Sequence, residues 1–360
     1  MPDGWEGRLA VLAAVLTVMA MLPGAAAAPA ATQEDCSFPV TVTDATGREV
    51  TLEEDPERVV TTNPSAAQTM WEIGAQDEVV GVSQYAAYLE GAGAKANVSG
   101  SGGPSVERIV ALEPDLVLVP NSTYGFAAER IEQIRSAGIP VYVFGQPTSI
   151  EYVVEKTRLT GRLTGNCEGA DERATRMEED VARIERAVES VERPVGLNYF
   201  FGFTSGENTF IGAIMETSGL RNGAAEAGIE GFMPINEETV VEMDPDWIVV
   251  PTSASVPNTE AYNSTTAVQQ DQIVQVNANY LQQPAPRTVE AMKTIVQAAH
   301  PEAYAQAELT TTTEATTTEA TTETTAPAET TTSGGQPGFT LGAAAAALVA
   351  ALALLARRSR

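Results

Sequence analysis

Short apolar runs alternate with helix-length segments through the first half of the chain. The runs are rich in valine and leucine and are bounded by turn residues, which is typical of buried strands. The longer segments carry helix signals, such as Pro64-Ser65 at one start and Gly138 after one end. This alternation with short links predicts an α/β domain with a mainly parallel sheet. The expected strands are 58–62, 79–82, 116–119 and 141–144, and the expected helices are 66–73, 105–112 and 126–137.

A long amphipathic helix is predicted at residues 167–191. Apolar side chains recur there at intervals of four and three residues, from Ala170 to Val191, and most other positions are charged. An unbroken helix of this length would measure about 37 Å and would bury one apolar stripe. We expect this helix to join two lobes, and a coiled-coil dimer is the alternative.

The α/β pattern resumes after Pro194, which predicts two similar lobes with mainly parallel sheets on one rigid helix. Ligand sites in open α/β sheets lie at the carboxyl ends of strands, often between domains, so we expect a ligand cleft between the lobes. The expected strands of the second lobe are 195–200, 247–250 and 273–276, and its expected helices are 209–218, 237–243 and 286–299.

One motif occurs twice, once in each predicted lobe. The segment "EPDLVLVP" ends at Pro120, and "DPDWIVVP" ends at Pro251, 131 positions later. Each copy follows a short helical segment and predicts an acidic-Pro-Asp turn and a buried strand. The repeat therefore supports two lobes of the same design.

Both ends of the chain carry targeting signals. Apolar residues 9–22 follow Arg8 and precede small residues, which predicts a secretory signal peptide. Residues 310–332 are almost entirely Thr, Glu and Ala, so we expect an extended stalk that is a candidate for O-glycosylation. An apolar stretch followed by arginines then fits a membrane span with positive residues inside. The predicted parts are a signal peptide 1–31, an N-terminal lobe 36–148, connecting helices 149–193, a C-terminal lobe 194–308, a stalk 309–336 and an anchor 337–360 with a transmembrane helix at 339–356.

The tail resembles the sorting signal of archaeal surface proteins, with Pro337-Gly338-Phe339, an apolar helix and then arginines. The resemblance implies that an archaeosortase cuts the tail and that a lipid anchor replaces it. A plain C-terminal transmembrane helix is the alternative. Either anchor would hold the body at the extracellular face of the cell membrane.

The charge of the chain is strongly negative. It has 48 acidic and 21 basic residues, for a formal net charge of −27. Such a surface repels nucleic acid, so we expect no nucleic-acid partner. The acidic residues are spread along the body and lysines are few, which predicts a halophilic, haloarchaeal source. A merely acidic protein is the alternative.

An extracellular location also bears on the asparagine and cysteine residues. A disulfide between Cys36 and Cys167 is the simplest use of the two cysteines, and two unrelated buried thiols are the alternative. Three Asn-x-Ser/Thr sites are available for glycosylation, at Asn97, Asn121 and Asn263.

An ordered set of motifs resembles the cobalamin, haem and ferric-siderophore class of ABC-transporter substrate-binding proteins. The set includes "FPVTVTDATGREVTL", "SVERIVALEPDLVLV", "EETVVEMDPDWIVV" and "PAPRTVEAM", and it extends over about residues 38–300. The resemblance implies two lobes bridged by a long helix and a shallow ligand cleft with little hinge motion. It also implies that a monomer delivers its small-molecule ligand to the permease subunits of an ABC importer.

The resemblance assigns roles to individual residues. Glu107 and Glu238 would dock onto permease arginines, whereas the alternative is that each is a first-turn acid stabilised by its helix dipole. Aromatic residues would supply flat walls for a large ligand, although core or rim packing remains the alternative for each. Arg287 would face an anionic ligand, cap a helix or bridge the lobes. The residues assigned to ligand binding are Tyr85, Tyr88, Phe203, Phe232, Tyr280 and Arg287.

Two functions follow from these patterns. The first is a membrane-tethered binding protein that captures cobalamin or a ferric siderophore, and sparse basic residues near the site disfavour a highly anionic siderophore. The second is a glycosylated structural or adhesion protein built on the same fold. The only histidine, His300, lies at the end of the body, so no His-based triad or His-rich metal cage can form. We therefore expect no enzymatic activity, no resident cofactor and no bound metal.

Overall fold

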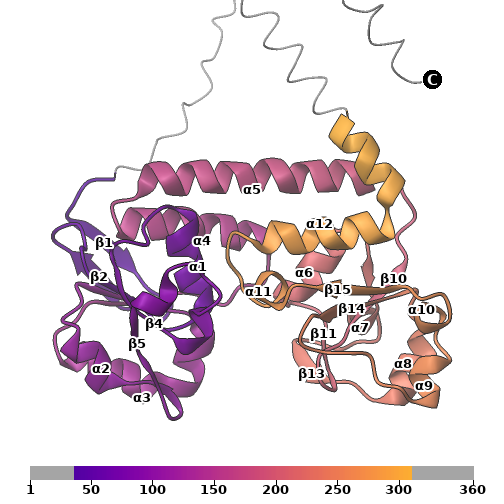
Figure 1. Cartoon of the computed structure of the whole chain (residues 1–360), viewed down its shortest axis with the longest axis horizontal. Coiled ribbons are helices and arrows are strands. Elements are labelled where there is room, and N and C mark those ends of the chain that lie inside the picture. The colour runs from indigo at the N-terminus through magenta and orange to yellow at the C-terminus, as the bar shows by residue number, and fades with distance from the viewer. Residues whose placement is uncertain (1–35, 310–360) are drawn as a thin grey trace, which may run out of the picture. The chain divides into compact units, whose positions relative to one another are not determined.

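The computed structural model describes residues 36–309, which form two α/β lobes (Figure 1). The N-terminal lobe is built on a five-stranded parallel sheet with the order β5-β4-β3-β8-β9. All residues of its strands β3 and β8 are buried, as expected for a parallel sheet covered on both faces. The strands are β3 (Val59–Thr61), β4 (Val79–Val82), β5 (Ala96–Asn97), β8 (Leu116–Val119) and β9 (Val141–Val143).

The C-terminal lobe repeats this design with a four-stranded parallel sheet in the order β12-β10-β14-β15. Its strands are β10 (Val195–Asn198), β12 (Arg221–Asn222), β14 (Trp247–Pro251) and β15 (Ile273–Val276). Its helices are α6 (Phe210–Thr217), α7 (Gly223–Glu226), α8 (Glu237–Met243), α9 (Glu260–Asn263), α10 (Thr266–Gln269), α11 (Ala278–Leu281) and α12 (Thr288–Ala299). The predicted fold class is thereby confirmed.

The long helix α5 (Cys167–Val188) passes along both lobes, beside α4 (Ile150–Leu163) (Figure 1). Its apolar stripe enters two different cores: Ala170 packs in the core of the N-terminal lobe, whereas Met177 and Ile184 pack in that of the C-terminal lobe. The predicted stripe is therefore a bridge between the lobes. The remaining helices of the N-terminal lobe are α1 (Pro64–Glu72), η1 (Gln84–Ala86), η2 (Ala92–Ala94), α2 (Val106–Ala111) and α3 (Asn121–Ser136).

Several elements differ from the predicted ones. Helix α3 begins five residues before the predicted 126–137, because Asn121 and the residues after it form a first segment that is interrupted by non-helical backbone at Ala127. After α12, residues 301–309 are helical again. Three antiparallel pairs were also not predicted, and the strands of two of these pairs, with two or three residues each, are too short to show alternation. They are β1 (Val40–Thr43) with β2 (Glu49–Leu52), β6 (Ser99–Gly100) with β7 (Gly103–Pro104), and β11 (Phe203–Ser205) with β13 (Phe232–Pro234).

The two copies of the acidic-Pro-Asp motif have the same geometry. Glu113 and Asp244 both adopt left-handed backbone, with φ of 45° and 41°, within two residues of the end of each copy's helix. Asp115 and Asp246 then each accept a hydrogen bond from a backbone N–H at the start of the neighbouring strand, at 2.9 and 2.8 Å. The motif therefore fixes a short helix against the parallel sheet in each lobe.

Both ends of the described chain lie on the α5 side of the lobes (Figure 1). Cys36 is joined by a disulfide to Cys167, the first residue of α5. The predicted signal peptide, the anchor with its transmembrane helix and nearly all of the stalk fall outside the described residues. Within residues 36–309, no helix combines the length and apolar character needed to cross a bilayer.

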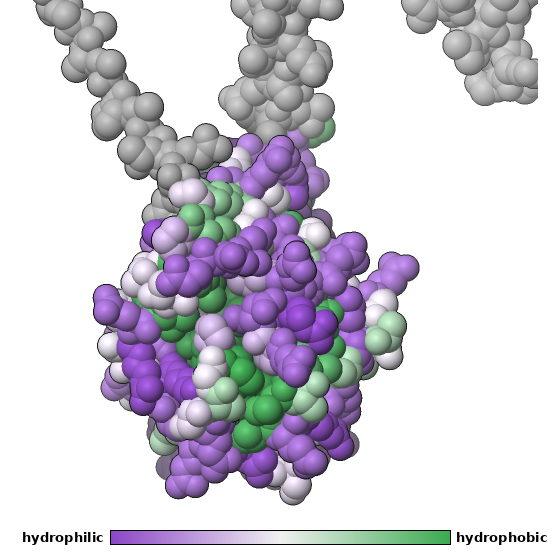
Figure 2. Space-filling model, turned by 90° about the vertical axis from the view of Figure 1, so that its left-hand side faces the viewer, coloured by the Kyte–Doolittle hydropathy of each residue, from purple (hydrophilic) through white to green (hydrophobic). Residues whose placement is uncertain are grey.

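The outer face of the N-terminal lobe is mainly hydrophilic (Figure 2). Figure 2 looks onto this lobe and shows hydrophilic side chains over most of the face, around an apolar area in its lower half. Arginine–glutamate pairs contribute to the hydrophilic surface, including the pair of Arg48 and Glu132 at 2.7 Å.

The close approach of α5 to α1 requires a glycine at position 169. A Cβ atom there would lie 2.2 Å from the backbone oxygen of Ile73, whereas a Cβ at Gly125 would meet nothing within 4 Å. We expect Gly169→Ala to lower the free energy of unfolding by about 1–3 kcal/mol, because the backbone of one helix must move. Gly125→Ala, the control, should be neutral or stabilising by up to about 1 kcal/mol. Urea titration measures both, and equal effects would refute this account.

Candidate functional site

Four of the six predicted ligand residues follow the carboxyl ends of the parallel strands. Tyr85 and Tyr88 come after β4, Phe203 comes after β10, and Tyr280 comes after β15. Since the carboxyl ends of parallel strands share one edge of a sheet, each lobe gathers these residues at one edge. Tyr85 is the most exposed of the four, at 69%.

In the C-terminal lobe, four phenylalanines form one aromatic group. Phe203 stacks on Phe232 with ring centroids 5.1 Å apart, and Phe200 makes an edge contact with Phe201 at 4.9 Å. Phe200 also lies 6.4 Å from Phe232, which connects the two pairs. Phe201, Phe203, Phe232 and the neighbouring Met233 are all exposed. The sequence indicated only two of these phenylalanines. The adjacent pair Phe200-Phe201 before a glycine was the signal for the others.

A tight turn presents this aromatic group. Phe200 and Phe203 exchange two backbone hydrogen bonds, of 3.0 and 2.9 Å, which closes a two-residue hairpin. Its central residues, Phe201 and Gly202, have φ of 47° and 87°, as in a type I′ turn. A phenylalanine at positive φ is strained, and 63% of Phe201 is exposed, so neither backbone preference nor burial explains this residue.

Tyr88, the second tyrosine assigned to the ligand in the N-terminal lobe, is held by a hydrogen bond within the protein. The Tyr88 hydroxyl accepts a hydrogen bond of 2.8 Å from Nε2 of Gln68, and burial raises the Tyr88 pKa above its ordinary value. Tyr280, the first residue after Asn279, is half-buried and packs against the core of the C-terminal lobe. Of the two N-terminal tyrosines assigned to the ligand, Tyr85 is therefore the more accessible.

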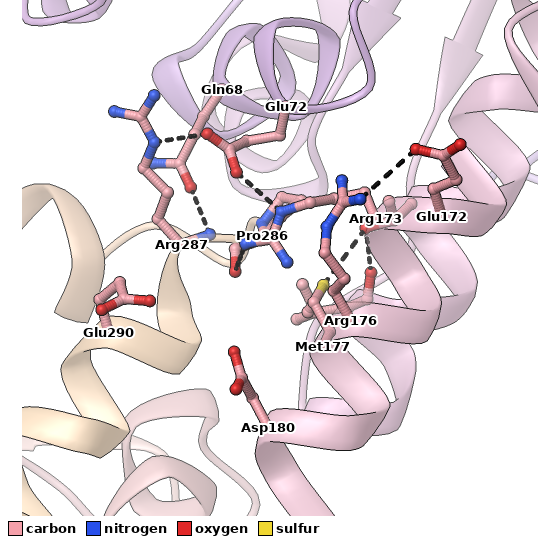
Figure 3. Close-up of polar contacts among 12 residues, drawn as sticks. Gln68, Glu72, Glu172, Arg173, Arg176, Met177, Asp180, Pro286, Arg287 and Glu290 are labelled. Carbon is pink, nitrogen blue, oxygen red and sulfur yellow. Dashed lines mark hydrogen bonds and ion pairs between the residues drawn. The ribbon is translucent and has the colours of Figure 1, made fainter. Parts of the chain in front are cut away.

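Gln68 connects the two lobes (Figure 3). Its side chain is fully buried on α1. Its Nε2 donates to the backbone oxygen of Asn279 at 3.1 Å, and its Oε1 accepts from the backbone N–H of Arg287 at 3.0 Å. One glutamine thus bonds both ends of the segment that precedes α12.

One turn further along α1, the Glu72 carboxylate binds two arginines. Its oxygens accept from Nε of Arg287 at 2.6 Å and from Nε of Arg173 at 2.7 Å, and Arg173 also donates to the backbone oxygen of Pro286 (Figure 3). Burial acts to raise the Glu72 pKa, but the hydrogen bonds and charges of the two arginines outweigh it and hold the pKa below its ordinary value. Of the three roles open to Arg287, the structure provides the bridge between lobes.

The two candidate docking acids occupy equivalent places. Glu107 and Glu238 are both exposed and lie in the first turns of α2 and α8. These helices lie at the ends of the two lobes that point away from α5 (Figure 1). Of the three sequons, Asn97 and Asn263 are exposed and Asn121 is half-buried.

His300 has a structural position. Its ring is buried, and Nε2 lies 3.0 Å from the backbone oxygen of Gly219. It therefore helps to hold the end of α12 against the C-terminal lobe.

Lys156 is a buried cation at the lobe junction that sequence reasoning missed. Its Nζ donates to the backbone oxygen of Pro284 at 2.9 Å and to Oγ of Ser65 at 3.3 Å, and it lies over the ring of Phe144. These partners are neutral, so burial lowers the Lys156 pKa from 10.5 to about 7.

This pKa shift makes stability depend on pH. Between pH 7 and 10.5 the unfolded chain holds a proton that the folded chain has released, so the contribution of Lys156 to stability rises with pH in this window and is lowest below it. When the pH falls from 10 to 6.5, we expect the free energy of unfolding of Lys156→Met to rise by about 1–3 kcal/mol relative to that of the wild type. Lys95→Met, at a half-buried loop position, is the control. Chemical denaturation at both pH values measures the difference, and an equal or opposite change would contradict this account.

Comparison with known proteins agrees with this architecture. The family model described as periplasmic binding protein matches residues 59–280. The cobalamin-binding protein of Halobacterium salinarum is 44% identical over 318 residues, which cover 82% of this chain and 85% of that protein. The periplasmic haem-binding protein RhuT of Roseiflexus has a TM-score of 0.61 at 26% identity, covering 68% of this chain and 99% of that one. The Fe3+-hydroxamate transport protein of Saccharomonospora viridis has a TM-score of 0.59 at 26% identity, covering 73% and 100%.

Proposed function

Since the chain belongs to the periplasmic binding protein family, we propose that it captures cobalamin and delivers it to the permease of an ABC importer. The main support is the exposed aromatic group at the carboxyl edge of the C-terminal sheet, in a chain that is 44% identical to a cobalamin-binding protein. Flat apolar side chains suit a large, flat ligand because they contact its faces at low entropic cost.

Charge favours cobalamin over an anionic chelate or haem. Glu207 and Glu230 form a β-bridge at one end of the β11–β13 pair, and both are exposed. Glu230 is two residues from Phe232, whereas Arg287 is paired with Glu72. Carboxylates beside the aromatic group repel haem propionates and anionic siderophores, but they leave the uncharged amide groups of a corrinoid unaffected.

Isothermal titration with cyanocobalamin, haemin and a ferric catecholate siderophore, whose iron complex is anionic, tests the ligand. We expect micromolar or tighter binding of cyanocobalamin and at least about tenfold weaker binding of the other two, since every 1.4 kcal/mol is tenfold. Binding of haemin or the siderophore alone would change the proposed ligand. Failure of all three at saturating concentration would favour the alternative, a glycosylated surface protein without a transport ligand.

Phe201 offers a sharper test of the site. Asparagine tolerates left-handed backbone better than phenylalanine, so Phe201→Asn should keep or raise the melting temperature. If Phe201 contacts the ligand, the same change should weaken cyanocobalamin binding by about tenfold or more. Calorimetry measures both quantities. A loss of stability with unchanged affinity would show that Phe201 is a packing residue.

The proposed location is the extracellular face of the cell membrane. The expected secretion signal and the C-terminal anchor, processed by an archaeosortase, would keep the binding protein near its importer. The disulfide between Cys36 and Cys167 and the exposed sequons are compatible with an extracellular environment.

Glu107 and Glu238 are the proposed contacts with the permease. We expect the double charge reversal Glu107→Lys/Glu238→Lys to weaken binding to the importer by at least about 100-fold, because two attractive contacts become repulsive. Cyanocobalamin affinity should not change. The control is Glu179→Lys/Glu185→Lys on α5, which alters net charge equally at exposed positions. Surface plasmon resonance on importer in nanodiscs measures binding, and equal losses for both double variants would refute specific docking.

A further inference from the structure

Each candidate docking acid has an exposed valine on the same face of its helix. Val110 follows Glu107 by three residues on α2, and Val241 follows Glu238 by three residues on α8. Residues three apart are neighbours on a helix surface. Val110 is 37% exposed and Val241 is 47% exposed, although valine is a residue that proteins usually bury.

The internal repeat relates these two acid–valine pairs. Val110 and Val241 are 131 positions apart, as are the two acids and the two prolines that end the repeats. In each copy the residue just before the valine, Ile109 or Val240, is fully buried and anchors the helix. In both lobes, the valine therefore points away from the buried side of the helix, on which Ile109 or Val240 lies.

Equivalent hydrogen bonds also set the start of each helix. The side chain of Ser105 accepts from the backbone N–H of Arg108, and the side chain of Asn236 accepts from that of Thr239. Ser105 and Asn236 are again 131 positions apart. Each lobe thus holds its acid and its valine in the same orientation relative to its own sheet.

We propose that the two valines are contact residues of the docking surface, and that each acid–valine pair fits a partner site with a cation beside a small aliphatic hollow. The proposal rests on the docking function proposed above. Because the same pair occurs on both lobes, the partner has two equivalent sites, as in a dimer of permease subunits. The carboxylates select a basic partner, and the isopropyl groups add apolar contact that is closed to water.

The two kinds of contact respond differently to salt. Salt screens the attraction between exposed charges, whereas it does not weaken apolar contact and some salts strengthen it. An acidic protein that docks through acids alone would lose its partner as salt rises. The valines supply the part of the contact that persists in concentrated salt.

The test measures importer binding for Val110→Thr, Val241→Thr and the double variant, because threonine keeps the shape of valine and removes one methyl contact. With the ABC importer in nanodiscs, we expect each single change to weaken binding by about three- to tenfold. The double variant should show about the product, since the sites lie on separate lobes. The affinity of the valine variants, measured again from about 0.2 to 2 M KCl, should change with salt as that of the wild type does. It should be weaker than the wild-type affinity at every salt concentration.

Controls separate this proposal from the docking function itself. Glu107→Gln/Glu238→Gln should flatten the salt dependence, which the valine variants should not do. Val181→Thr on α5, at the opposite side of the lobes, should leave importer binding unchanged, and the variants on α2 and α8 should retain their melting temperature and cyanocobalamin affinity. If the glutamine variant loses binding and the valine variants do not, the valine contact is refuted and docking stands. If the wild type does not bind the importer at any salt concentration, both proposals fall.

Discussion

The relative position of the two lobes depends on one carboxylate that is largely, though not fully, withdrawn from solvent, that of Glu72. A buried charge is unfavourable unless it is paired, and Glu72 is paired with Arg173 of the long helix and with Arg287 at the start of the closing helix. Three elements from different parts of the chain must therefore be correctly placed before the charge is compensated. Gln68, one helical turn earlier, adds neutral hydrogen bonds to the same segment. The lobes are held by α1 as well as by the bridging helix.

Because the lobes are held at the junction, the choice of ligand would depend on the surfaces that face it. The strained turn at Phe201 presents aromatic rings that a flexible loop would hold less firmly. The neighbouring carboxylates disfavour anionic ligands. The junction thus holds the lobes through paired charges, whereas one strained aromatic residue, Phe201, lies at the proposed binding surface, where its backbone conformation would serve to present the rings.

The sequence predicted the parallel sheets and the bridging helix because burial sets their hydrophobic periods. Strands β8 and β15 and helix α8 have their predicted bounds. It did not predict the β11–β13 pair or the turn at Phe201, because such short elements depend on backbone geometry and on partners distant in sequence. The roles of Gln68 and Glu72 were hidden for the same reason: their partners lie more than 100 residues away. Tyr85 and Phe232 were indicated as ligand residues and remain exposed, but their contact with ligand is still a prediction.

The described chain begins and ends on the α5 side, whereas α2 and α8 lie at the opposite ends of the lobes (Figure 1). A tether attached at either end of the described chain would therefore lie on the α5 side and leave both acid–valine pairs accessible. The same geometry sets a minimum for a membrane tether. A body held at its C terminus must turn over before these pairs can meet the membrane, so the linking segment has to be at least as long as the lobes are deep. If the chain is tethered and docks as proposed, shortening that segment would keep both acid–valine pairs from the importer without changing any of their residues.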